Sequence, residues 1–251
     1  MHRFANPARF LRLAAAIQPW TAAATVLLIG AGLYFGLIAS PADYQQGQTV
    51  RIMYVHVPSA WLGMACYSTM AIASAMALIW KHPLADLIGK SAAPIGAAFT
   101  FLCLVTGSLW GKPMWGTWWA WDARLTSMLI LFFLYLGYMA LANAFDDPTR
   151  GAKASAVLAL AGFVNVPVIK FSVDWWNTLH QPASVTKIGM PSIDPSMLLP
   201  LLLMGVGFTT FFVTVLLVRV RSEIMASKIR AIRLMQIHST PGAVASGEVV
   251  G

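Results

Sequence analysis

The chain has 251 residues, of which 58% are hydrophobic and only 10% are charged, and its mean hydropathy is +0.69. Soluble domains usually carry about 25% charged residues, so this composition excludes an ordinary soluble domain and indicates a membrane protein. The formal net charge of +8 would suit a nucleic-acid ligand in a soluble protein. Here the basic residues fall mainly at the two ends and in alternate loops, where they orient a membrane protein.

Six apolar segments follow one another along the chain, each long enough to cross a bilayer core of about 30 Å as a helix. They are Trp20–Ser40, Ser59–Trp80, Ser91–Trp110, Leu125–Phe145, Ala154–Phe171 and Met197–Val218. A helix satisfies its own backbone polar groups in lipid. The sequence therefore predicts an all-α integral membrane protein, a bundle of six transmembrane helices.

Three of these segments carry further information. The first is longer than the apolar region of a signal peptide, which has about 7–15 residues, so we expect an uncleaved helix. The fifth contains Asn165, Pro167 and Lys170, and we expect it to be kinked. Cys66 and Cys103 lie inside the second and third segments without a CxxC pair, so we interpret them as small buried residues.

The distribution of lysine and arginine predicts the orientation. Most of the 17 basic residues lie near the termini or in the short loops 81–90 and 146–153, so the positive-inside rule places both termini in the cytoplasm. The outer loops are then about 41–58, 111–124 and 172–196. We expect a cytoplasmic N-terminal segment over 1–19, the membrane domain over 20–220, and a cytoplasmic tail over 221–251 that begins as a basic helix and ends in a composition typical of disorder.

The second outer loop is unusually rich in tryptophan. Five of the ten tryptophans fall within residues 110–124, namely Trp110, Trp115, Trp118, Trp119 and Trp121. An aromatic belt at the membrane interface is the alternative interpretation, but a belt spreads over many helix ends. Flat apolar faces beside water suit a large planar aromatic ligand. Arg124 has the planar fork that binds carboxylates, although a local ion pair with Asp122 fits equally well.

Two histidines lie on the same outer side as this loop. His56 comes just ahead of the second predicted helix, and His180 lies in the third outer loop. A single interfacial histidine usually only forms hydrogen bonds, but two that flank a tryptophan-rich loop can supply both axial ligands of a haem iron. Trp175 and Trp176 extend the aromatic character towards His180, or belong to a belt. The other histidines fall on the cytoplasmic side.

The run from Trp115 to Thr126, WGTWWAWDARLT, resembles the tryptophan-rich WWD motif of haem-handling proteins in cytochrome c maturation. With six helices and the two outer histidines, the chain resembles the haem exporter protein C family (CcmC) over about residues 15–225. The resemblance implies that a WWD loop over 110–126 cradles haem and that His56 and His180 are its axial ligands. The motif residues are Trp115, Gly116, Trp118, Trp119, Trp121 and Asp122, and Arg124 is added as a candidate for a haem carboxylate.

The resemblance also implies a cofactor, a location and partners. Members of the family hold haem b at the periplasmic face of the bacterial inner membrane and deliver it to the haem chaperone CcmE, where it becomes attached to a histidine. They assemble with the ATP-binding subunit CcmA, the membrane subunit CcmB and the one-helix subunit CcmD as part of an ABC transporter complex. Whether such a chain acts as a haem lyase stays open. Gly89-Lys90-Ser91 lacks the leading glycine of a Walker A loop, so ATP hydrolysis must come from a partner.

Two other classes of protein compete with this interpretation. A b-type cytochrome subunit holds haem between histidines within the membrane, and no histidine falls inside a predicted span. A secondary permease needs charged groups or broken helices near the middle of the membrane, and only the fifth segment hints at these.

Overall fold

The structure is a computed structural model, and residues 6–182 and 184–239 of it are described. Within these residues the chain is helical apart from its connections and one isolated bridge between Asp43 and Gly47. The α-helices are α1 (Pro7–Leu33), α2 (Met53–Trp80), α3 (Pro83–Trp115), α4 (Ala123–Ala142), α5 (Pro148–Gly162), α6 (Asn165–Trp175) and α7 (Pro195–Ser239). A π-helical segment, Tyr34–Ala39, extends α1, and a 3-10 helix, Gln48–Ile52, leads into α2.

The prediction of six membrane-spanning segments is confirmed. Among the described residues, 6 helical stretches are long and apolar enough to cross a bilayer: Pro7–Ala39, Gln48–Trp80, Pro83–Trp115, Ala123–Ala142, Pro148–Trp175 and Pro195–Gln236. The fifth stretch consists of α5 and α6, which are separate helices on either side of residues 163–164. The helix is therefore interrupted close to Asn165 and Pro167, in the segment where a kink was expected.

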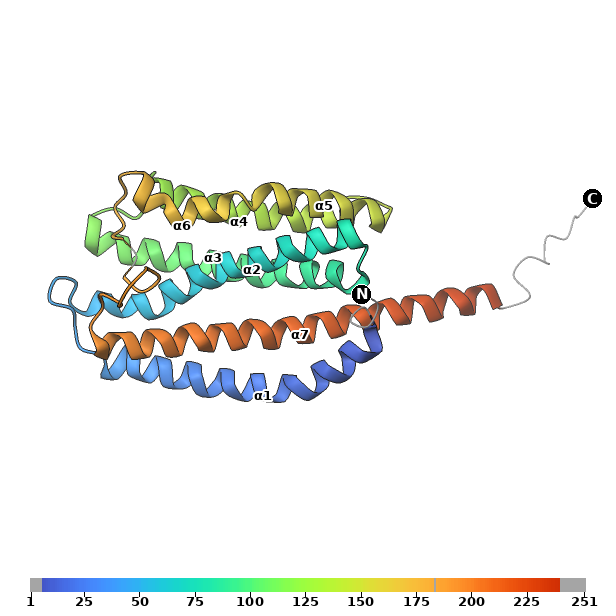
Figure 1. The fold of residues 1–251 in the computed structure, drawn as a ribbon, viewed down its shortest axis with the longest axis horizontal. Helices are drawn as coiled ribbons and strands as arrows, with labels where there is room; N and C mark the ends of the chain where they lie inside the picture. The colour runs from blue at the N-terminus through green and yellow to red at the C-terminus, as the bar shows by residue number, and fades with distance from the viewer. Residues whose placement is uncertain (1–5, 183, 240–251) are drawn as a thin grey trace, which may run out of the picture.

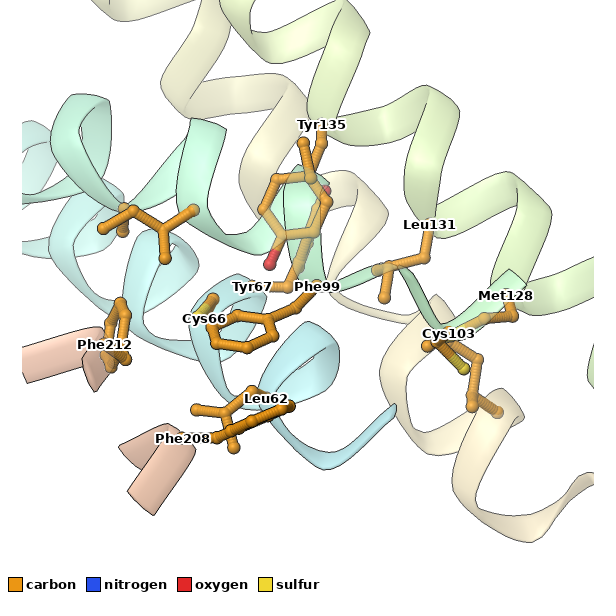
Figure 2. Close-up of a cluster of buried hydrophobic side chains, with 14 of the residues drawn as sticks. Leu62, Cys66, Tyr67, Phe99, Cys103, Met128, Leu131, Tyr135, Phe208 and Phe212 are labelled. Atoms are coloured by element: carbon orange, nitrogen blue, oxygen red, sulfur yellow. The ribbon is translucent and has the colours of Figure 1, made fainter. Parts of the chain in front are cut away.

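The helices form three layers (Figure 1). The antiparallel helices α1 and α7 form one layer, α2 and α3 the middle one, and α4 with α5 and α6 the third. Side chains from α2, α3, α4 and α7 meet in the centre, as Figure 2 shows for Tyr67, Phe99, Tyr135 and Phe208. The Tyr135 hydroxyl donates to the Gly63 carbonyl at 2.8 Å. This buried contact joins α4 to α2.

Both cysteines are free and buried, as predicted. Cys66 belongs to the central cluster of Figure 2. Cys103, on α3, lies in the same cluster, but its main chain also takes part in the site described below.

Besides α1 and α5, which begin at Pro7 and Pro148 instead of Trp20 and Ala154, three predicted boundaries are wrong. Residues 53–58 belong to α2, not to the first outer loop, so His56 lies inside the helix. The predicted segment began at Ser59, but the 3-10 turn Gln48–Ile52 runs directly into α2. The helix α3 continues to Trp115 instead of ending at residue 110, because the glycine that stops it is Gly116, at φ 76°.

The third boundary concerns the last helix. α7 runs without a break from Pro195 to Ser239, and its C-terminal part projects beyond the rest of the bundle (Figure 1). The basic helix expected after Val218 is thus a continuation of the membrane helix. The predicted disordered end of the tail, 240–251, lies outside the described residues, as do His2 and the side chain of His238.

Candidate functional site

His56 is held against α3 on one edge of its ring. Its Nδ1 lies 3.1 Å from the Cys103 carbonyl oxygen and 3.2 Å from Thr106 Oγ1. The carbonyl can only accept, so Nδ1 carries the proton and donates, which leaves the lone pair on Nε2. The Nε2 atom makes no hydrogen bond to any residue in the described parts of the chain. A histidine fixed in this way has the tautomer required of a metal ligand.

The position of the His56 ring also depends on how closely α2 and α3 approach each other. The ring lies edge-to-face on Trp110, with ring centroids 5.6 Å apart. A Cβ added at Gly107 would lie 3.0 Å from His56 Cε1, so a larger residue there would press on the ring. The Trp110 indole in turn donates to Gln46 Oε1 at 3.0 Å. The first outer loop therefore fixes the tryptophan that supports His56.

His180 lies in the segment between α6 and α7, at the same end of the bundle. Its ring stands edge-to-face on Trp115, with centroids 5.0 Å apart and an angle of 67° between the planes. Its Nδ1 lies 3.5 Å from Asp122 Oδ2, within ion-pair distance but without good hydrogen-bond alignment. Trp110 and Trp115, on which the His56 and His180 rings rest, both lie within the last two turns of α3. The structure therefore brings the two histidines together from distant parts of the chain.

Asp122 connects the tryptophan loop to the His180 loop. Its Oδ1 accepts from the Leu125 N–H at 2.7 Å and so caps α4, while its Oδ2 accepts from the Leu179 N–H at 3.2 Å. The side chain is only 8% exposed. Burial would raise the pKa of Asp122, but the His180 contact and the two backbone N–H groups outweigh it and lower the pKa below its ordinary value. The carboxylate is therefore charged at neutral pH.

Arg124 does not pair with Asp122, so the ion pair considered from the sequence is not formed. Its guanidinium donates to Ser172 Oγ at 3.2 Å and to the carbonyls of Ile169 and Lys170 at 3.4 and 3.3 Å. These groups lie in the second half of α6, so Arg124 joins the start of α4 to α6. Its Nη1 has no partner among the described residues, which leaves one donor for an anionic group.

The tryptophans predicted to form one platform are divided between two faces of α3. Cys103, Thr106, Gly107 and Trp110 lie on the face that carries His56. Trp118, Trp119 and Trp121 instead line a groove of about 530 Å³ with Leu104, Val105, Ser108, Leu109 and Leu129. At 100° per residue, these α3 positions point away from the His56 face. The groove is apolar and lies beside the outer end of α3 and α4.

Local contacts hold the loop that carries these tryptophans. Gly116 ends α3 in the left-handed conformation and donates its N–H to the Lys112 carbonyl at 3.1 Å. The Lys112 ammonium donates to the Gly116 carbonyl and lies 5.9 Å from the centre of the Trp118 ring. Trp119 and Trp121 meet edge-to-face at 5.6 Å. Trp118 and Trp121 remain exposed, by 56% and 79%.

Sequence reasoning missed the residues that orient His56. Thr106, Gly107 and Gln46 were not considered, and Trp110 was considered only as part of the aromatic run. A usable signal exists, because Cys103, Thr106, Gly107 and Trp110 follow the spacing of one helical face. Nothing in the sequence, however, indicates which helix would face it.

Comparison with known proteins identifies the family. The family model described as "Heme exporter protein C" matches residues 1–235. The chain belongs to the haem exporter protein C family. The protein named heme exporter protein C in Bradyrhizobium diazoefficiens is 61% identical over 92% of this chain and 88% of its own length. Those of Haemophilus influenzae and Escherichia coli K12 are 53% and 48% identical, each over 90% of this chain and 92% or 91% of their own length. The resemblance inferred from the WWD run is thereby confirmed.

Proposed function

We propose that this chain binds haem b at the periplasmic face of the bacterial inner membrane and transfers it to the chaperone CcmE for cytochrome c maturation. The relatives named above are haem exporter proteins, which supports haem handling as the general role. The single observation that carries the proposal is the convergence of His56 and His180 at one end of the bundle, each resting on a tryptophan of α3.

The donor set fits haem iron. An axial histidine binds iron through one ring nitrogen and gives its other N–H to a carbonyl or carboxylate. His56 meets this condition through the Cys103 carbonyl. His180 Nδ1 lies 3.5 Å from Asp122 Oδ2, and the lowered pKa of Asp122 keeps this carboxylate charged, so a small rotation of the ring would let it meet the same condition. Among the described residues there is no group of three or more His, Cys, Asp or Glu side chains suited to a bare metal ion. Two histidines without a third ligand suit an iron whose equatorial ligands come from a porphyrin.

The surrounding side chains suit the rest of the haem cargo. The rings of Trp115, Trp118, Trp119 and Trp121 offer apolar area near the outer end of α3, where a porphyrin gains from burial and stacking. Gly116 provides the turn that presents them. The Nη1 donor of Arg124 suits a haem propionate. In this proposal the chain holds and orients haem, and release to CcmE requires one histidine to leave the iron.

The energy for export is proposed to come from partners. The chain has no Walker A loop, so we propose that it acts with the ATP-binding subunit CcmA, the membrane subunit CcmB and the small subunit CcmD in an ABC transporter complex. The name of the matching family supports a role in export. The six spanning helices are compatible with a membrane-embedded subunit of this kind.

An absorption spectrum of the detergent-purified chain, expressed with its partners, tests the proposal. We expect a Soret band of low-spin bis-histidine haem in the wild type, and its shift or loss in His56→Ala and His180→Ala. His82→Ala is the matched control, because His82 precedes α3 at the opposite end of the bundle. An unchanged spectrum in both site variants would refute the ligand assignment.

A second measurement separates haem delivery from electron transfer. The position of His56 within α2 gives the b-type cytochrome interpretation an observation that the sequence alone did not. Incubating the haem-loaded protein with purified haem-free CcmE discriminates the two. Movement of haem to CcmE supports delivery, whereas haem that stays with the chain and only cycles between oxidation states supports an electron-transfer subunit.

A further inference from the structure

A groove between α3 and α7 lies away from the histidine site. Its lining consists of apolar residues and one arginine: Pro94, Ile95, Ala98, Phe99, Leu102, Phe211, Val215 and Arg219. Its volume is about 360 Å³. The Phe99 ring contacts Phe208 and Phe211, with centroids 5.3 and 6.0 Å apart, and closes the groove on the side of the bundle core. The open side faces the surroundings of the bundle, where lipid lies.

Each wall of the groove is a row of residues spaced by four along its helix. On α3 the row is Pro94, Ala98 and Leu102, with Lys90 one turn before it and outside the lining, and on α7 the row is Phe211, Val215 and Arg219. The helices are antiparallel, so both rows run from apolar residues to a basic residue in the same direction. From Pro94 to Leu102, and likewise from Phe211 to Arg219, the rise is about 12 Å. This is close to the depth of one leaflet of a hydrocarbon core about 30 Å thick.

The basic end of the groove carries Arg219, with Lys90 nearby. The exposed Arg219 side chain forms no hydrogen bond or ion pair with any of the described residues. Lys90 lies on the same face of α3 as Pro94, one turn away, and interacts electrostatically with Asp86. Pro94 has no N–H to donate to the Lys90 carbonyl, so this carbonyl lacks its usual helical partner. In the orientation predicted from the basic residues, this end lies at the cytoplasmic surface of the membrane.

We propose that this groove binds one anionic phospholipid of the cytoplasmic leaflet. The acyl chain would lie along the two apolar rows, and the phosphate would bind Arg219, with Lys90 beside it. Charge complementarity favours this occupant, because a neutral helix would leave Arg219 unpaired. The inference does not depend on haem binding.

Native mass spectrometry of the delipidated full-length chain tests the proposal. Palmitoyl-oleoyl phosphatidylglycerol and the phosphatidylcholine with the same acyl chains are titrated separately. We expect one phosphatidylglycerol to bind more tightly than phosphatidylcholine, and Arg219→Gln to weaken it about fivefold. Arg219→Lys keeps the charge and should retain most of the affinity. Arg233→Gln removes an equal charge about 21 Å further along α7 and should have no effect.

A second variant tests whether the apolar part of the groove binds the acyl chain. Ala98→Trp places a large ring in the groove and should lower binding of both lipids, while the protein elutes as a single species in size-exclusion chromatography. Equal binding of both lipids in wild type and Arg219→Gln would overturn the proposal, and so would equal losses in Arg219→Gln and Arg233→Gln. In native membranes, cross-linking of Ala98→Cys to another protein subunit would assign the groove to a helix instead and would also overturn it.

Discussion

Replacing Asp122 by asparagine separates the two roles of this side chain. Asparagine is also a good N-cap, and its single carbonyl oxygen can still accept from the Leu125 N–H, which lies 2.7 Å from Asp122 Oδ1. Its amide nitrogen takes the place of Oδ2, so the substitution removes the negative charge 3.5 Å from His180 Nδ1 together with the 3.2 Å bond from the Leu179 N–H. Loss of such a partner of a metal-bound histidine typically costs 10- to 100-fold in affinity, about 1.4–2.7 kcal/mol. We therefore expect haem affinity to fall by this factor in Asp122→Asn.

Asp122→Ala is the matched comparison, since it removes both the charge and the cap. It should lose the same haem affinity and, in addition, about 1 kcal/mol of stability from the α4 N-cap. Haem titration followed by Soret absorbance measures the affinity, and thermal unfolding of the haem-free protein in detergent measures the stability. Wild-type affinity in Asp122→Asn would refute the argument that Asp122 acts through His180.

The lowered pKa of Asp122 also predicts a pH dependence of stability. An aspartate in an unfolded chain has a pKa of about 3.9, and the folded value lies below it. The carboxylate therefore contributes its full stabilisation above about pH 4, and this is lost as the pH falls through the folded pKa. Unfolding measured from pH 7 to pH 2 should show this acid-dependent part in the wild type and lack it in Asp122→Asn. An identical acid response in both would contradict the assignment.

Two glycine substitutions test the packing around the site and in the core, and a third serves as a control. Gly107→Val pushes against the His56 ring, since even a Cβ lies 3.0 Å from Cε1, and should lower haem affinity about tenfold by Soret titration. Gly30→Val, where an added Cβ meets nothing within 4 Å, should leave the affinity unchanged; equal losses would contradict the role of His56. Gly96→Val overlaps the buried Tyr135 ring and should lower the unfolding temperature through a cost of about 1–3 kcal/mol. Unaltered thermal unfolding would show that the helices can move apart there.

The membrane helices were predictable because each depends on a long local pattern. A stretch of about twenty apolar residues in lipid must satisfy its backbone hydrogen bonds within its own helix, whichever helices pack beside it. The break near Asn165 and Pro167 was also local, and it was found. The ends of the helices were harder to predict. α2 begins before Pro58 and α3 continues to Gly116 because short turns and a left-handed glycine decide these ends, and hydropathy does not register them.

The candidate site was only partly visible in the sequence, because helical phase and the choice of neighbours decide it. The sequence indicated that His56, His180 and the tryptophan loop belong to one end of the bundle. It did not indicate that α3 presents Trp110 to His56 while Trp118 and Trp121 face the groove on its other side. The partner of Arg124 was equally hidden, since two interpretations were open and the observed contacts with α6 were neither of them.

The two histidines lie in parts of the chain that differ in the free energy needed for local unfolding. His56 is carried by a helix packed on α3, whereas His180 lies in a stretch without helix or strand among its described residues, anchored by Asp122 and a turn through Thr178. Opening such a stretch takes less free energy than unravelling a packed helix, so amides of 177–182 should exchange with deuterium well before those of 53–62. For the proposed function this implies a directional hand-over, in which His180 would detach first and the cargo would leave from its side while still held by His56.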